Sequence, residues 1–147
     1  MWSPQAVVVC ALMLLGRTGQ NFPAVQFVEK APIGVSASAE AYVLTEEKRI
    51  VLVTSSWAFR VARQAHYQCG RVEALQQIAG VLAHEEWHVR HGVDEEGAYD
   101  AQLTALTSVG AGAVLFNSVM RAKLRAVSES KRHAQEGVLA RQFLSGR

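Results

Sequence analysis

The stretch VLAHEEWHVRHGVDEEGAYDAQL, residues 81–103, decides the fold. Its first half completes an apolar pattern of helical spacing, and Gly92 is typical of the position just past a helix C-terminus. These signals predict a helix from Val72 to His91. Asp94 is a typical N-cap and predicts that a second helix starts soon after the glycine. We therefore expect two consecutive helices joined by a short turn.

The first of these helices carries an HExxH motif formed by His84, Glu85 and His88. The spacing of four residues places both imidazoles on one helix face, where they can bind a single zinc ion. Glu85 is rotated by about 100° from His84 and can act as general base on a metal-bound water. The alternative is a pair of solvated surface histidines. Trp87 and the apolar stripe predict a mostly buried helix, in which polar groups need partners, and this favours the metal site.

A third metal ligand is needed, because a catalytic zinc site has three protein ligands and one open position. The side chains with suitable donor atoms near the motif are His91, Glu95, Glu96 and Asp100. His91 lies about 10 Å along the helix axis from His84, too far for both to bind one ion from a straight helix. It is interpreted as a helix C-terminal residue favoured by the helix dipole.

The motifs LAHEEWH and DEEGAYDAQL together resemble the gluzincin metallopeptidases, in particular the compact minigluzincins. In that family a second helix carries the pattern ExxAD, and its first glutamate is the third zinc ligand. Alignment on Ala98 implies that this ligand is Glu95, with Tyr99 in place of the family's aspartate. Alignment on Asp100 implies Glu96 instead. We favour Glu95 and keep Glu96 as the alternative.

The resemblance covers residues 41–106 and implies a zincin-like fold, a zinc cofactor and hydrolysis of peptide bonds through a metal-activated water. It also implies an edge strand that pairs with the backbone of a peptide or protein substrate, and the stretch Ile50–Thr54 is assigned to that role. Asp100 and Tyr99 are expected to orient the zinc-binding imidazoles. The alternative function is a zinc-binding regulatory or membrane-surface domain without proteolysis, and the retention of Glu85 counts against it.

The rest of the chain predicts an α+β fold. Its 147 residues suit a single core. Strand formers at Ala41–Thr45 and Ile50–Thr54 flank a charged link and predict a β-hairpin, and a further strand is expected at Val25–Val28. We expect a small antiparallel sheet packed against a helical layer. A last helix is expected from about Val114 to about Gln135, with apolar residues such as Leu124 between basic ones.

The apolar run Ala6–Leu15 is too short to span a bilayer comfortably but suits a signal peptide. We therefore expect a signal peptide or membrane anchor at residues 1–20 and a single metallopeptidase domain at residues 21–147. The protein is expected to be exported, either secreted or periplasmic, or to be membrane-anchored. Cys10 lies in the apolar run and forms no metal-ligand spacing with Cys69, so no disulfide is expected.

The basic charge of the chain is concentrated near its C-terminus. Residues 121–147 hold seven basic and two acidic side chains, a net charge of +5, whereas the whole chain carries +2. No nucleic-acid reading motif accompanies these charges, so nucleic-acid binding is not expected. The basic helix is interpreted as a solvated face, with membrane contact as the alternative.

Overall fold

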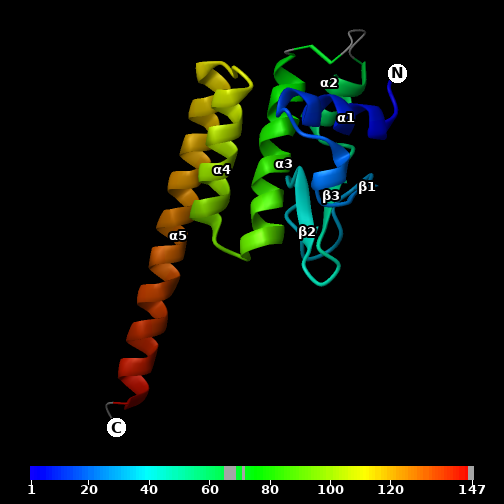
Figure 1. The fold of residues 1–147 in the computed structure, drawn as a ribbon. Coiled ribbons are helices and arrows are strands. Elements are labelled where there is room, and N and C mark those ends of the chain that lie inside the picture. The colour runs from blue at the N-terminus through cyan, green and yellow to red at the C-terminus, as the bar shows by residue number, and fades with distance from the viewer. Residues whose placement is uncertain (65–68, 71, 146–147) are drawn as a thin grey trace.

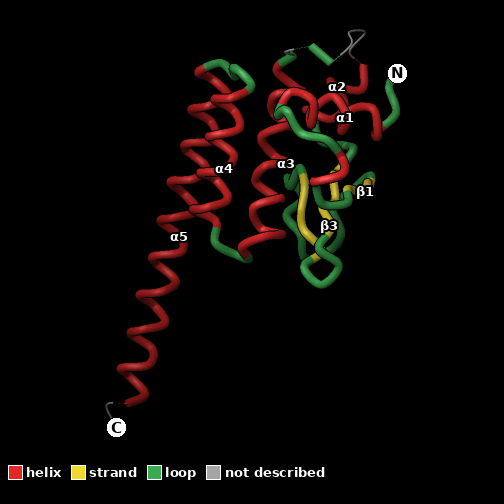
Figure 2. The backbone as a smooth tube through the Cα atoms, in the orientation of Figure 1, coloured by secondary structure: helices red, strands yellow, loops and turns green. Residues whose placement is uncertain are grey.

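The computed structural model describes residues 1–64, 69–70 and 72–145 and has the predicted α+β class. Its elements are α1 (Pro4–Leu14), the short 3-10 helix η1 (Gly19–Asn21), β1 (Val25–Val28), β2 (Ala41–Leu44), β3 (Arg49–Val53), α2 (Trp57–Gln64), α3 (Glu73–His91), α4 (Glu95–Ser108) and α5 (Ala113–Ser145). Helix α3 lies in the middle. Helices α1 and α2 and the sheet lie on one side of it, and α4 and α5 lie on the other (Figures 1 and 2).

The sheet has three strands in the order β1-β3-β2. The predicted hairpin is confirmed, because β2 and β3 pair antiparallel with Ala41 opposite Leu52 and Leu44 opposite Arg49. The expectation of a purely antiparallel sheet is wrong, since β1 pairs with β3 in parallel. Local sequence signals fix the hairpin, whereas the direction of β1 depends on a long connection that they do not describe.

The strand β3 is central and not an edge strand, so the role predicted for Ile50–Thr54 in substrate pairing is wrong. Ile50 and Val51 are completely buried, and Leu52 and Val53 are nearly so. The uninterrupted apolar run IVLV suits a strand covered on both faces and flanked by two neighbours. Within the part of the chain that the structure describes, β2 is an edge strand of the sheet and packs against α3.

Helix α3 has almost the predicted bounds, because Val72 is its N-cap residue and His91 its last residue. The apolar stripe is buried, with Leu75 and Leu82 fully inaccessible to water. Gly92 ends the helix with a φ of 93°, a left-handed conformation that L side chains rarely adopt. This helix therefore forms the scaffold of the core and ends in a sharp change of chain direction.

The N-terminal apolar run forms α1, which packs into the core through residues such as Val7 and Ala11, both completely buried. A disulfide joins Cys10 of this helix to Cys69. The expectation of no disulfide is therefore wrong, because it treated Cys10 as part of a segment separate from the fold. In the part of the chain that the structure describes, no helix is both long and apolar enough to cross a membrane.

Helix α5 continues about ten residues past its predicted end and extends beyond the rest of the molecule (Figure 1). Its first turns pack against α4 through Leu115 and Val119, which are buried. Leu124, further along the helix, is 60% exposed. The apolar spacing of α5 continues along the helix, but apolar residues in its later turns, such as Val138 and Leu139, are exposed.

Candidate metal centre

The two histidines of the motif lie side by side on the last turns of α3. The Nε2 atoms of His84 and His88 are 3.2 Å apart, and the ring centroids are 4.9 Å apart. Their separation of one helical turn brings the rings to the same face, as the spacing predicts. Both Nε2 atoms thus point toward one small volume.

Glu95 reaches the same volume from the first turn of α4. Its Oε1 lies 2.7 Å from Nε2 of His88, and its Oε2 lies 3.5 Å from Nε2 of His84. The reversal at Gly92 and the N-cap Asp94, whose carboxylate accepts the backbone N–H of Glu96 at 3.1 Å, set the start of α4. The three side chains offer donor atoms within 4.8 Å of one another and could hold a metal ion.

The other two side chains considered as ligands near this turn lie away from the cluster. Glu96 is exposed, as its position next to Glu95 on the helix requires. His91 is also exposed, and its ring packs against Trp87 with the centroids 4.6 Å apart.

Hydrogen bonds at the far side of each imidazole fix its orientation. Nδ1 of His84 lies 2.9 Å from Oε1 of Gln102, and Nδ1 of His88 lies 2.6 Å from the carbonyl oxygen of Gly92. Because both oxygens can only accept, each Nδ1 donates, so the neutral form of each ring carries its proton on Nδ1 and its lone pair on Nε2. This is the tautomer that metal binding through Nε2 requires.

The expectation that Asp100 orients an imidazole is wrong. Asp100 is exposed and forms an ion pair with Lys123 of α5 at 2.6 Å. Gln102 takes the expected position, and the sequence contains a signal for it. It is seven residues after Glu95, two turns along the same face of α4. Tyr99 does lie against the site, with its ring edge-on to His84 and the centroids 4.6 Å apart.

The ionisable groups of the cluster shift the pKa values of one another. The hydrogen bond that His88 donates to Glu95 raises the pKa of His88 to about 9. Hydrogen bonds from His84 and His88 lower the pKa of Glu95 to about 2. A proton on His88 therefore competes directly with any cation for its Nε2 atom.

Glu85 lies beside the cluster and is only 9% exposed. Burial raises the pKa of Glu85, the two neighbouring histidines oppose this shift, and Glu95 adds to it. A carboxylate whose pKa is raised is a stronger proton acceptor than an exposed one. Glu85 makes no ion pair within the described residues, so its charge is available to a group in the cleft.

A cleft of about 540 Å³ opens onto these side chains. One wall consists of His84, Glu85, His88, Glu95 and Tyr99, and the other contains β2 and the segment before it, including Ser36, Ala41, Tyr42 and Val43. The free edge of β2 thus lies along the cleft. The His84–His88–Glu95 cluster, the buried Glu85 and a strand edge that is unpaired among the described residues thus line one cavity.

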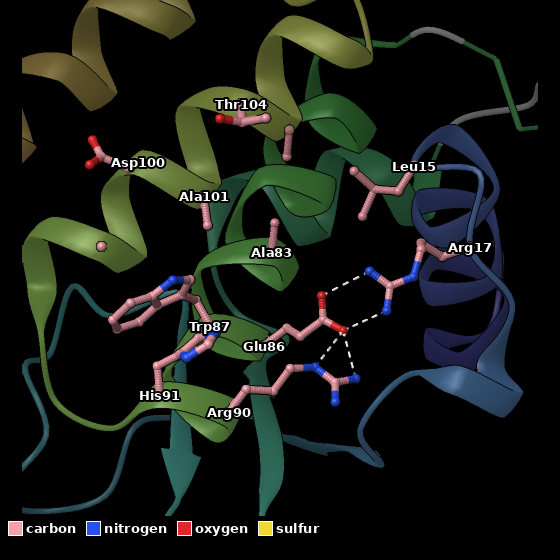
Figure 3. Close-up of a pocket in the computed structure, with 12 residues that line it drawn as sticks. Leu15, Arg17, Ala83, Glu86, Trp87, Arg90, His91, Asp100, Ala101 and Thr104 are labelled. Atoms are coloured by element: carbon pink, nitrogen blue, oxygen red, sulfur yellow. Dashed lines mark hydrogen bonds and ion pairs between the residues drawn. The ribbon is translucent and has the colours of Figure 1, made fainter.

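The opposite face of α3 lines a different pocket of about 600 Å³ (Figure 3). There Glu86 points at Arg17 and Arg90, with oxygen–nitrogen distances of 2.6 and 3.0 Å in the two ion pairs (Figure 3). Gly97 of α4 approaches Trp87 so closely that a Cβ atom would lie 2.2 Å from the indole ring. This face joins the segment after α1 to α3 and α4 and contains none of the clustered donor atoms.

No protein-family model matches the chain, and no curated protein and no solved structure matches it either. The gluzincin resemblance therefore stays a prediction carried by the motif residues.

Proposed function

We propose that the protein is a zinc-dependent metallopeptidase of the gluzincin type, with a zincin-like arrangement of α3, α4 and β2. His84, His88 and Glu95 hold the metal, and Glu85 is the general base. The observation that carries the proposal is the convergence of three donor groups, from two helices, at a cleft that also contains Glu85.

The donor set fits zinc. Two imidazole nitrogens and one carboxylate oxygen are frequent ligands of catalytic zinc and leave a fourth position open. Gln102 and Gly92 hold the proton of each neutral imidazole on Nδ1, which leaves Nε2 as the nitrogen that can bind the metal. Glu95 and His88 must exchange their mutual contact for the metal, so binding releases a proton near neutral pH.

When bound, zinc supplies a water of lowered pKa and polarises the scissile carbonyl. Glu85 accepts the proton of that water at its carboxylate and passes it to the leaving amine. Burial of Glu85, which raises its pKa, suits both steps because the group must gain and then lose a proton. Tyr99 packs on His84 and restricts the tilt of its ring.

The substrate in this proposal is an extended peptide or protein segment. It pairs with the free edge of β2, the strand that lines the cleft, and not with β3 as expected from the sequence. Strand pairing satisfies the peptide backbone and holds the scissile bond against α3. This assignment keeps the predicted substrate class and changes the strand that binds it.

The cellular location is part of the proposal. We infer that the protein works outside the reducing cytosol, because disulfides such as Cys10–Cys69 persist in oxidising compartments. Export agrees with this inference, whereas anchoring through residues 1–20 would require α1 to leave the core in which Val7 and Ala11 are buried. Fractionation of the producing cells, with detection of the protein in each fraction, measures the location directly.

Metal analysis and a single variant test the proposed activity. We expect one zinc per purified chain and hydrolysis of a mixed peptide library that a chelator abolishes. Glu85→Gln should keep the zinc and lose at least about a hundredfold in rate, since it removes the proton acceptor. Zinc without hydrolysis in the parent favours the alternative, a non-proteolytic zinc-binding domain. Absence of bound zinc overturns both.

A further inference from the structure

The cleft has a second lobe on the other side of Tyr99. This lobe, of about 310 Å³, shares Ala41, His84, Glu85 and Tyr99 with the larger cavity. Its remaining walls come from α3, α4 and α5 and from Glu40, the residue before β2. We call it the helix-side lobe. The lobe would therefore lie beside a peptide that pairs with β2 and has its scissile bond at Glu85.

Glu40 is a partly buried carboxylate in the wall of the helix-side lobe that the proposed mechanism does not use. Nε2 of Gln77 donates to its Oε1 at 2.5 Å. Within the described residues no lysine or arginine forms an ion pair with Glu40. Burial raises the pKa of Glu40, and the hydrogen bond from Gln77 only partly offsets this effect. A cation that enters the lobe would favour the ionised form of Glu40, because a nearby opposite charge opposes the effect of burial.

The charge of the lobe favours a cationic occupant. Its lining contains two carboxylates, Glu40 and Glu85, and one formal positive charge, Arg125. Arg125 lies on the exposed part of α5, whereas Glu85 is buried and Glu40 is partly buried. The fields of buried charges are screened less by water than those of exposed ones. Apolar walls, including Val81 and Val119, suit the methylene groups of a long side chain.

We propose that the helix-side lobe receives a lysine or arginine side chain next to the scissile bond of the peptide substrate. Glu40 is the specificity-determining carboxylate, and Gln77 holds it in place. The inference rests on the proposed function, because it assigns a substrate class to the same cleft. It adds a prediction that the metal cluster alone does not make.

Binding measurements test the lobe independently of hydrolysis. The probes are Nα-acetyl-arginine amide and Nα-acetyl-leucine amide, titrated into the zinc-loaded full chain and followed by NMR chemical shifts. The arginine probe should bind more tightly than the leucine probe. Glu40→Gln should weaken the arginine probe at least about tenfold, as loss of a charged hydrogen-bond partner does, and leave the leucine probe unchanged.

A matched control is Glu47→Gln, which removes the same charge at an exposed position in the hairpin turn. It should not change the affinity of either probe. As a second variant, Glu40→Lys should reverse the preference toward Nα-acetyl-glutamate amide. Because this variant predicts a gain, it tests the lobe even if Glu40→Gln folds poorly.

Equal affinity for the arginine and leucine probes overturns the inference, as does an unchanged arginine affinity in folded Glu40→Gln. The inference is also overturned if the parent protein prefers Nα-acetyl-glutamate amide and this preference disappears in Arg125→Gln. Hydrolysis of library peptides without enrichment of lysine or arginine beside the cut site overturns this inference and keeps the proposed function. Arginine binding through Glu40 in a chain that cleaves no peptide supports the helix-side lobe as a site for a cationic side chain and overturns the proposed function.

Discussion

Glu85 and Glu86 are neighbours on α3, but their pKa values are shifted in opposite directions. Burial raises the pKa of Glu85, which has no ion-pair partner in the described part of the chain. Burial also acts on Glu86, but hydrogen bonds from Arg17 and Arg90 outweigh it and lower the pKa of Glu86. A rotation of about 100° between consecutive helical residues separates the two environments.

The comparison extends to the whole of the two helix faces. On the Glu86 face the charges are paired within the protein, and Arg17 ties the segment after α1 to α3 (Figure 3). On the Glu85 face the donor atoms of His84, His88 and Glu95 lie close to one another and could hold a shared metal ion. The ion pairs of the Glu86 face join two parts of the chain. The side chains of the Glu85 face could hold a metal ion.

The largest expected effect separates two adjacent carboxylates on α4. Glu95→Ala should lower the zinc affinity at least about a hundredfold, because loss of a ligand exceeds the typical loss from its supporting groups. Glu96→Ala should change the affinity little, since Glu96 is exposed. Competition with a zinc-binding dye measures both values. Equal losses in the two variants would contradict the assignment of Glu95 as the third ligand.

An intermediate effect is expected at Gln102, which holds Nδ1 of His84. Gln102→Leu should weaken zinc binding about tenfold, because the imidazole loses the partner that fixes its tautomer and plane. Gln76→Leu is a matched control, since Gln76 is also buried on the core side but its amide donates to the carbonyl of Val109. The control should lower the midpoint of thermal unfolding without a change in zinc affinity. Unchanged zinc affinity in Gln102→Leu would show that this hydrogen bond does not position the ligand.

The smallest effect belongs to the other face of α3 and concerns stability. Glu86→Gln should lower the free energy of unfolding by about 1 kcal/mol, a value that allows for the solvent around both arginines. The folded-state pKa of Glu86 is lowered. Its contribution is therefore present above the ordinary carboxyl pKa of about 4.3 and is lost as the pH falls through the folded-state value.

Urea unfolding at several pH values measures this contribution. The difference between the parent and Glu86→Gln should be constant from pH 5 to pH 7 and should shrink below about pH 4. Zinc affinity should not change in this variant. A loss of zinc affinity similar to that of Gln102→Leu would mean that the two faces of α3 are not independent.

The sequence predicts the helices of the site because their signals are local. The glycine that ends α3, the N-cap that starts α4 and the spacing of four between the histidines all act within a few residues. The position of Glu95 follows from these signals once the turn at Gly92 is formed. The cluster is thus specified by a short stretch of chain.

The wrong predictions concern contacts between distant segments. The parallel pairing of β1, the central place of β3 and the Cys10–Cys69 disulfide join residues far apart in the sequence. Asp100 was assigned by its position along the helix, but Lys123 of α5 lies close enough to pair with it. Periodicity gives the face of a residue and does not identify the element that packs against that face.

The disulfide has a consequence for the covalent history of the molecule. Cys10 and Cys69 lie on either side of the exposed residues Gly19–Asn21. A protease that cuts the backbone there yields two polypeptides that remain one molecule until a reductant acts. The mass of the intact protein would rise only by one water, and α1 would stay with the body that it covers. Removal of this helix therefore needs two chemical events, hydrolysis and reduction, in either order.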